Sequence, residues 1–460
     1  MENINFLPVL AVLIGLASIS LFFYFNYDLI QPTVSFFFVM TFSLFLGVFN
    51  INKWNLYVGP DTSLIVLGGM LSFAMGAGFL HFYFYNRVAA NVVRSKNKIE
   101  KIKFGIYKVP YLIVVICSFI TLILSLMSVK ELYELSLQLG NQSGLANMIM
   151  TLRYPLERGE ISFSRWVSYR NLVAMIFATS FLFVFMNNLI MRSRLLLRDC
   201  VYLLPIVSTI PFFIMSTGRR SIVHFIICGL VMAIILYQRK NGTSHKAKLK
   251  IVKMIGVTGI FSIVLYFILG FLTGKVSIGG RSPLTIISHY GGLSVPALEQ
   301  YVTSVHVENQ YFLQNTMMGI YGNLNSLGFH FEPGRPFLPF VEFQGTEHIT
   351  TNVYTIFYRL LADYSFPGLL IIMFAFGVIL TYFYDDLKHS NSSCKLVIYS
   401  YYGYIPFFLF IDDQFMGLFT SRTVYFCILL SGFIYLLDYK YFQLCGNSEE
   451  DIVSNNDEST

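Results

Sequence analysis

Runs of about 20 apolar residues recur along this chain and constrain its fold more than any other feature of the sequence. A run of this length matches the thickness of a bilayer, and a segment in lipid must satisfy its own backbone hydrogen bonds as a helix. The sequence therefore predicts an all-α polytopic membrane protein with about eleven transmembrane helices (10–12). The predicted spans are residues 6–25, 32–51, 63–85, 108–128, 167–190, 200–216, 221–237, 254–273, 365–384, 396–411 and 420–437.

The composition supports a membrane location for most of the chain. Only 12% of the 460 residues are charged, whereas 55% are hydrophobic. Soluble domains carry about 25% charged residues, so lipid must be the main solvent here. The first six residues contain no basic cluster and lead into a full-length apolar run. We therefore expect a first span at this end, and not a cleaved signal peptide.

Basic residues gather in every second connection between the predicted spans. Loops rich in Lys and Arg stay in the cytoplasm, so this pattern predicts the orientation of the bundle. It places the N-terminus outside and the C-terminus in the cytoplasm, and an extra or missed span near residues 1–60 would reverse only the N-terminus. The net charge of +7 comes largely from these loops, so it indicates orientation and not nucleic-acid binding. The basic residues are Arg87, Arg94, Lys96, Lys98, Lys101, Lys103 and Lys108; Arg192, Arg194 and Arg198; Arg239, Lys240, Lys246, Lys248, Lys250 and Lys253; and Lys388 and Lys395.

This topology divides the chain into a membrane domain, residues 1–437, and a short cytoplasmic polar tail, residues 438–460. Two long extracytoplasmic segments lie within the membrane domain, residues 129–166 and residues 274–364. The first carries Leu132, Leu135 and Leu139 at helical spacing, which predicts an amphipathic helix at the membrane interface. The second is interrupted by five prolines but is rich in apolar and aromatic residues. That composition argues against disorder, so we expect this large loop to be functional.

Several classes of chemistry are excluded by missing patterns. The segments predicted outside contain no cysteine, and no metal-binding spacing, P-loop, dinucleotide fingerprint or serine-nucleophile elbow is present. The cytoplasmic loops are too short for a domain that binds ATP or a nucleotide sugar. We therefore expect no cofactor and no metal, and a substrate that arrives through the membrane plane or from outside.

The hairpin from Ser216 to Ser221, between the predicted sixth and seventh spans, contains Arg219 and Arg220 on the outer side. Adjacent arginines there run against the positive-inside bias, and arginine near lipid is costly without a partner. One interpretation is headgroup contact or an ion pair with an outside carboxylate, namely Glu299, Asp363 or Asp412. The other is a guanidinium clamp for an anionic lipid-linked substrate, because arginine binds phosphate oxygens through two parallel hydrogen bonds.

The large loop adds further polar candidates. Histidine is the usual general base near neutral pH, although most loop histidines are only surface or hydrogen-bonded residues. We expect the two acidic pairs, Asp385–Asp386 inside and Asp412–Asp413 outside, to cap helices. The loop cations are Lys275, Arg281, Arg335 and Arg359, and its histidines are His289, His306, His330 and His348.

Three segments resemble the membrane polymerases of O-antigen and capsule repeat units (the Wzy type). The first is the S-T-G-R-R-S hairpin that leads into a span. The second, from Thr351 to Leu369, is similar to the family's N-V-Y-T…D-F-G-x-x-G stretch, with Asp363 and Gly368 in place but Ser365 at a position that is usually small or glycine. The third runs from Tyr290 to Tyr301, and Arg281 and Gly292 have the family's R-x10-G spacing. Motif-level matching is confined to about residues 150–170, 216–240 and 281–384.

The resemblance implies a helical bundle like that of the GT-C glycosyltransferases and a metal-independent glycosyl transfer outside the cytoplasmic membrane. A polyprenyl-pyrophosphate-linked glycan would be moved from its carrier onto another lipid-linked repeat unit. The implied partners are this donor and acceptor, the lipid bilayer, a flippase and a chain-length regulator, with no nucleic acid. We expect arginines to stabilise the pyrophosphate and a histidine or carboxylate to act as base. The expected pyrophosphate-binding residues are Arg219, Arg220, Arg281, Arg335 and Arg359, and the expected catalytic residues are His289, Asp363 and Glu299.

Two alternatives remain. An O-antigen ligase-type enzyme would use the same donor with a lipid A core as acceptor. A transporter or flippase of lipid-linked glycans belongs to a different class and would carry charged groups along a path through its spans. The predicted spans are almost free of charge at their centres, which favours an enzyme at the outer surface. A purely structural scaffold does not explain the outside arginines.

Overall fold

The fold is known from a computed structural model, which describes residues 4–94, 105–142, 144–157, 161, 163–215, 219–242, 244–272, 283–304, 311–331 and 338–444. Seven of its helices are long and apolar enough to cross a membrane, which makes the chain a multi-pass helical membrane protein. These helices are α1 (Leu7–Tyr24), α4 (Pro60–Arg94), α5 (Tyr111–Gln138), α7 (Arg165–Arg192), α10 (Arg219–Asn241), α15 (Ile356–His389) and α18 (Ser421–Tyr441). Two further helices occupy predicted spans: α2 (Pro32–Val48), which is shorter, and the long α11 (His245–Leu272).

The remaining two predicted spans, residues 200–216 and 396–411, are not continuous helices. The first is divided into η1 (Leu197–Leu203), α8 (Leu204–Val207) and α9 (Ile210–Met215). The second is divided into α16 (Ser393–Tyr402) and α17 (Ile405–Phe408), and η2 (Met416–Leu418) follows. Pro205, Pro211 and Pro406 each stand in the first turn of a new short helix, because proline lacks the amide hydrogen that would continue the preceding one.

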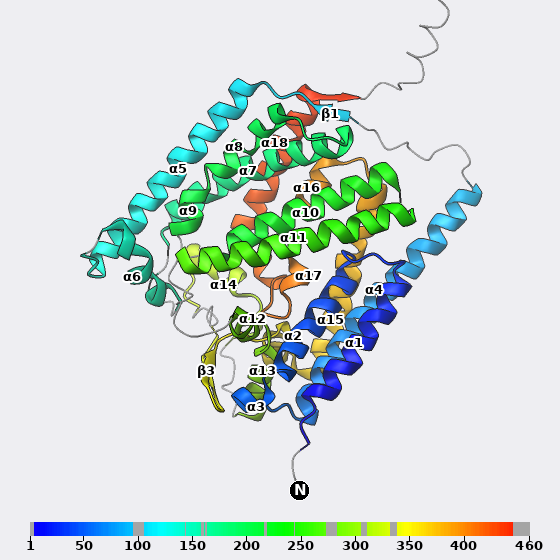
Figure 1. Cartoon of the computed structure of the whole chain (residues 1–460), viewed down its shortest axis with the longest axis vertical. Coiled ribbons are helices and arrows are strands. Elements are labelled where there is room, and N and C mark those ends of the chain that lie inside the picture. The colour runs from blue at the N-terminus through cyan, green and yellow to red at the C-terminus, as the bar shows by residue number, and fades with distance from the viewer. Residues whose placement is uncertain are drawn as a thin grey trace, which may run out of the picture.

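The long helices form two groups with separate hydrophobic cores (Figure 1). One core lies between α1, α2, α4 and α15, and the other lies between α5, α7, α10 and α18. Helices α4 and α15 approach most closely where glycine removes the side chain. A Cβ on Gly76 would lie 2.1 Å from the Phe374 carbonyl oxygen, and one on Gly377 would lie 2.0 Å from that of Phe73. Small residues at such crossings let two backbones pack directly against each other.

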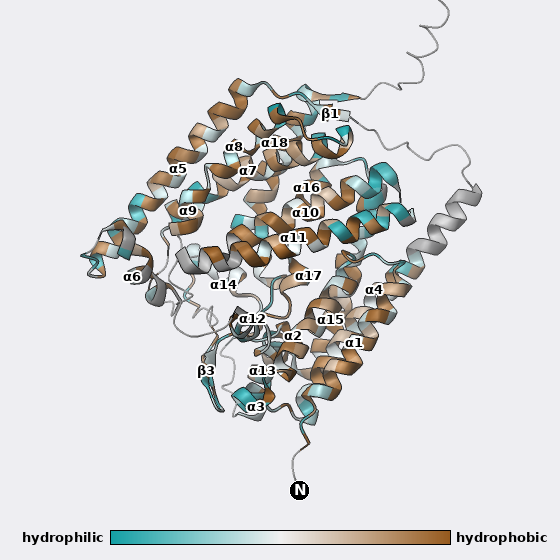
Figure 2. Cartoon of the chain, in the orientation of Figure 1, coloured by the Kyte–Doolittle hydropathy of each residue, from teal (hydrophilic) through white to brown (hydrophobic). Residues whose placement is uncertain are grey.

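Cations at the C-terminal end of α10 cap the C-terminal ends of two other long helices, α7 and α15, at one end of the molecule. Lys240 Nζ donates to the carbonyl oxygens of Ile190 (2.9 Å) and Met191 (2.8 Å) in α7. Arg239 Nη2 donates to Leu387 O in α15 at 2.8 Å. These bonds satisfy carbonyls that a helix end leaves unpaired. Figure 2 shows the same hydrophilic region where α10 meets α11. The basic connections predicted to share a side therefore meet in space.

Short elements of the large loop gather at the opposite end of the bundle (Figure 1). They are α12 (Pro283–Gly291), α13 (Ser294–Thr303), α14 (Met318–Ser326) and an antiparallel hairpin of β2 (Val341–Gln344) and β3 (His348–Thr351), in which Val341 pairs with Thr351. They pack near α3 (Ile51–Trp54): Lys53 Nζ lies 3.1 Å from Glu347 Oε1. The described part of this loop is thus folded onto the helix ends, as its composition predicts.

Two sequence boundaries differ in the structure. Leu132 and Leu135 belong to α5, which continues as one helix to Gln138, so the predicted separate interfacial helix is wrong at this position. Leu132 is buried there in the hydrophobic core, and the neighbouring Glu131 pairs with Arg170 of α7. A second helix, α6 (Leu145–Glu157), follows. At the other boundary, residues 438–444 complete α18 and β4 (Phe442–Leu444), which pairs with β1 (Gly105–Tyr107).

Candidate functional site

A pocket of about 360 Å³ with a mixed polar lining lies between α7, α10, α16, η2 and α18. It sits near the first residues of α10 and α18, and therefore away from the end where Arg239 and Lys240 cap their neighbours. Its polar and aromatic lining includes His224, Tyr401, Tyr404, Thr420, Arg422 and Thr423. Within the described residues we treat this pocket as the candidate site, because it brings a base, a cation, hydroxyls and aromatic rings together.

His224 is a histidine that lines this pocket. Its Nε2 contacts the carbonyl oxygen of Tyr401, and its ring centroid lies 4.5 Å from that of Tyr401 and 4.2 Å from that of Tyr404. A carbonyl oxygen can only accept, so Nε2 is the donor and the neutral ring carries its lone pair on Nδ1. The contact fixes the tautomer that a general base needs.

The start of α18 supplies the cation and two hydroxyls. Thr420 caps the helix: its Oγ1 accepts from the Thr423 amide at 3.1 Å and lies 3.0 Å from the Thr423 hydroxyl. Arg422 follows in the first turn and is exposed. Ser421 Oγ donates to Asn323 Oδ1 at 2.9 Å, which ties this turn to α14 of the large loop. A helix N-terminus and a guanidinium both favour a bound anion.

The hairpin arginines begin the helix that carries His224. Arg219 and Arg220 form the first turn of α10, and Arg220 and His224 are four residues apart, so their positions share one face of the helix. The side chains of the two arginines lie outside the described structure. Arg281 and Arg335, together with Lys275 and His306, also lie outside the described residues.

Arg359 is buried in an ion pair. It is 3% exposed and forms a two-bond ion pair with Asp412, with Nε donating to Oδ1 at 2.7 Å and Nη2 to Oδ2 at 2.9 Å. An arginine predicted to lie outside does therefore pair with Asp412, and it is Arg359, whereas the sequence offered Asp412 as a partner for the hairpin arginines. The arrangement supports a structural role for Arg359 between α15 and the segment before α18.

The three expected catalytic residues each join two elements. Asp363 accepts hydrogen bonds from the Thr316 amide and hydroxyl, both at 2.7 Å, and thereby holds the segment before α14. Glu299, which is 7% exposed, accepts from the Gly59 amide at 2.8 Å where α4 begins. His289 Nε2 contacts Thr350 O at 2.7 Å and links α12 to β3. These contacts are those of residues that position the loop.

The acidic pairs divide between capping and ion pairing. Asp413 Oδ1 accepts from the Phe415 amide at 2.9 Å and the Met416 amide at 3.0 Å at the start of η2, whereas Asp412 pairs with Arg359, so the outer pair fits the capping prediction at Asp413 alone. Burial raises the pKa of Asp413 to about 6. The inner pair was expected to cap a helix, and this expectation is wrong: Asp386 lies 2.8 Å from Lys395 Nζ, and its neighbour Asp385 likewise forms ion pairs. These two carboxylates pair with side chains of α15 itself and of other helices.

Sequence reasoning missed His224 and Arg422. His224 is a single polar residue in an apolar run, and Arg422 opens the last predicted span. A signal was present in each case, since His224 follows Arg220 by four residues and Arg422 is another arginine on the predicted outer side. Among the described residues, no three His, Cys, Asp or Glu side chains are grouped so that they could hold a metal ion.

No known family model, curated protein or solved structure matches the chain. The fold and the pocket define a polytopic helical membrane protein with a polar site near one end of the bundle.

Proposed function

We propose that this protein is a membrane glycosyltransferase that polymerises polyprenyl-pyrophosphate-linked repeat units into O-antigen or capsular polysaccharide. The reaction takes place on the outer face of the cytoplasmic membrane. The observation that carries the proposal is the pocket that His224 and Arg422 both line, beside the Arg219–Arg220 turn of α10. Its place, away from the basic helix ends, supports an outward-facing site under the positive-inside rule.

The chemistry follows from the charges. The acceptor hydroxyl attacks the anomeric carbon of the donor, and the bond from that carbon to the pyrophosphate oxygen breaks. Arg219, Arg220 and Arg422 stabilise the charge that develops on the pyrophosphate. His224 takes the hydroxyl proton on Nδ1, and this replaces His289 as our first choice of base. Arg281 and Arg335 remain candidates for the same anion.

Aromatic rings provide the surface that a glycan needs. Tyr401 and Tyr404 line the pocket with their rings packed beside His224, and the parts of the rings that border the pocket offer apolar contact to a sugar. In this proposal the expected catalytic residues act by positioning elements of the large loop near the pocket; they are Asp363, Glu299 and His289. A flippase that delivers the donor and a chain-length regulator are the partner proteins of such a polymerase in the cell, and the transfer step itself needs neither.

Reconstitution tests the proposal. Purified protein in vesicles is supplied with lipid-linked repeat units, and the products are resolved as a ladder. We expect Arg220→Ala and Arg422→Ala to reduce elongation by about 10²–10³-fold. Arg198→Ala is the matched control, because Arg198 is exposed next to the opposite, basic end. Normal ladders from both variants would refute the arginine role, and no ladder from the wild type would refute the polymerase.

Two other functions are separated by the same preparation. A ligase-type enzyme transfers the donor only when a lipid A core acceptor is added. A transporter moves labelled substrate across the bilayer without elongating it. The transporter is favoured by one observation, the two interrupted apolar segments α8–α9 and α16–α17, because broken helices often form transporter binding sites.

A further inference from the structure

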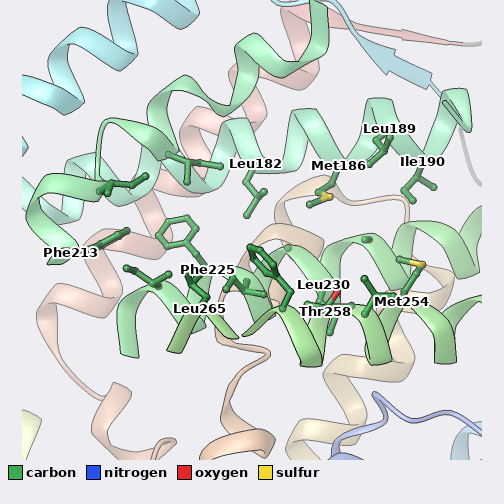
Figure 3. A pocket seen from close by; sticks show the side chains of 18 of the residues that line it. Leu182, Met186, Leu189, Ile190, Phe213, Phe225, Leu230, Met254, Thr258 and Leu265 are labelled. Atoms are coloured by element: carbon green, nitrogen blue, oxygen red, sulfur yellow. The ribbon is translucent and has the colours of Figure 1, made fainter. Parts of the chain in front are cut away.

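A second, larger cavity lies on the other side of α10. It is an apolar groove of about 820 Å³ between α7, α9, α10 and α11. Figure 3 shows that Leu182 and Met186 face it from α7, while Leu230 and Thr258 face it from the α10–α11 pair. The groove has no part in the proposed glycosyl transfer. It forms only where these helices pack, so hydropathy along the sequence does not predict it.

The two walls of the groove differ in how firmly they are held. Phe213 and Phe225 are 4% and 8% exposed, so the inner wall is part of the protein core. On α11, Val257 and Phe261 line the groove and are 60% and 57% exposed. Helix α11 packs chiefly against α10, and it therefore leaves a gap between itself and α7. In a bilayer an apolar gap of this kind must be filled by hydrocarbon.

The positive charges in the lining of the groove lie at one of its ends. Lys250 and Lys253 lie at one end, in the part of α11 that follows the basic α10–α11 connection, and the lining contains no carboxylate. Lys250 Nζ lies 4.9 Å from the centre of the Tyr237 ring, which holds the amine beside the groove. From Lys250 to Leu265 the helix rises about 22 Å, more than half of a hydrocarbon core about 30 Å thick. The groove therefore has the length of a lipid chain and cations at one mouth.

We propose that this groove binds an anionic phospholipid, with its phosphate at Lys250 and Lys253 and an acyl chain between α7 and α11. The charge of the mouth selects an anionic headgroup, because each nearby lysine favours one by about five-fold. A lipid-linked glycan is not the occupant, because its pyrophosphate belongs at the opposite end of α10 in the proposed reaction. The bound lipid fills the gap and holds α11 against the bundle.

Native mass spectrometry of the full-length, delipidated protein in detergent tests this site. Palmitoyl-oleoyl phosphatidylglycerol and the matching phosphatidylcholine are titrated separately. We expect phosphatidylglycerol adducts at about 25-fold lower concentration, from two lysines of about five-fold each. Lys250→Gln with Lys253→Gln should abolish the preference. Lys246→Gln should keep it, because Lys246 is on the same helix and outside the groove. Equal binding of the two lipids by the wild type, or an unchanged preference in the double variant, overturns the proposal.

A second variant tests the groove itself. Thr258→Trp places a large ring in the cavity from the loosely packed helix, so it should reduce phosphatidylglycerol binding at least ten-fold while the protein still elutes as a single species. Unchanged binding would show that the lipid sits elsewhere. A polyprenyl phosphate that binds through the same lysines when phosphatidylglycerol does not would identify a different occupant and also overturn the proposal. Neither result bears on the polymerase assay, so the two proposals fail separately.

Discussion

Replacing Asp412 by Asn would remove the carboxylate that forms the two-bond ion pair with the buried Arg359. Arg359 is 3% exposed, whereas the Asp412 side chain is 26% exposed, and two hydrogen bonds of 2.7 and 2.9 Å join them. Breaking a buried ion pair by removing one partner costs about 3–5 kcal/mol. Because Asp412 is partly open to solvent, we expect a loss near the lower figure, about 3 kcal/mol.

The assay is equilibrium unfolding in mild detergent, with the double variant Arg359→Met, Asp412→Asn beside each single change. Removing the buried charge as well should recover much of the loss, so the double variant should be more stable than Asp412→Asn alone. Glu134→Gln is the control, since Glu134 forms an exposed ion pair with Lys130 on one helix and should change stability by less than about 0.5 kcal/mol. If Asp412→Asn matches this control, or if the double variant is the least stable protein, the structural role of Arg359 is refuted.

Three other predictions concern packing, pH and catalysis. Gly76→Val should lower the free energy of unfolding by about 1–3 kcal/mol, because a Cβ there would lie 2.1 Å from the Phe374 carbonyl oxygen. Equilibrium unfolding measures this loss, and Gly432→Val, in open space on α18, should cost less. Burial raises the pKa of Asp413 from 3.8 to about 6, so the stability that Asp413 contributes is fully present below pH 3.8 and is lost as the pH rises through 6. Asp413→Asn should therefore flatten the dependence of stability on pH between about 3.8 and 6, and an unaltered dependence would contradict this. His224→Gln should slow elongation by about 10²–10⁴-fold without loss of membrane insertion, and a normal rate would exclude His224 as the base.

The sequence by itself determines where most of the long helices lie and which basic helix ends come together. Apolar runs such as residues 167–190 and 420–437 appear as α7 and α18, because hydropathy over 20 residues is a local property that lipid enforces directly. The basic connections also come together as predicted, since Lys240 reaches the end of α7 and Arg239 reaches the end of α15. The breaks at residues 200–216 and 396–411 had a local cause in proline, but the length of the apolar runs concealed it.

The tertiary structure alone decided which polar residues meet. Arg359 and Asp412 are 53 residues apart and His224 and Tyr401 are 177 apart, and no periodicity links positions at such distances. Once the helices pack, burial makes an unpaired charge or donor costly, so Asp363, Glu299 and His289 take partners in the loop. The same packing brings His224 and Arg422 to one pocket and separates α11 from α7. The spans follow from local hydropathy, whereas the sites follow from contacts that only the folded bundle creates.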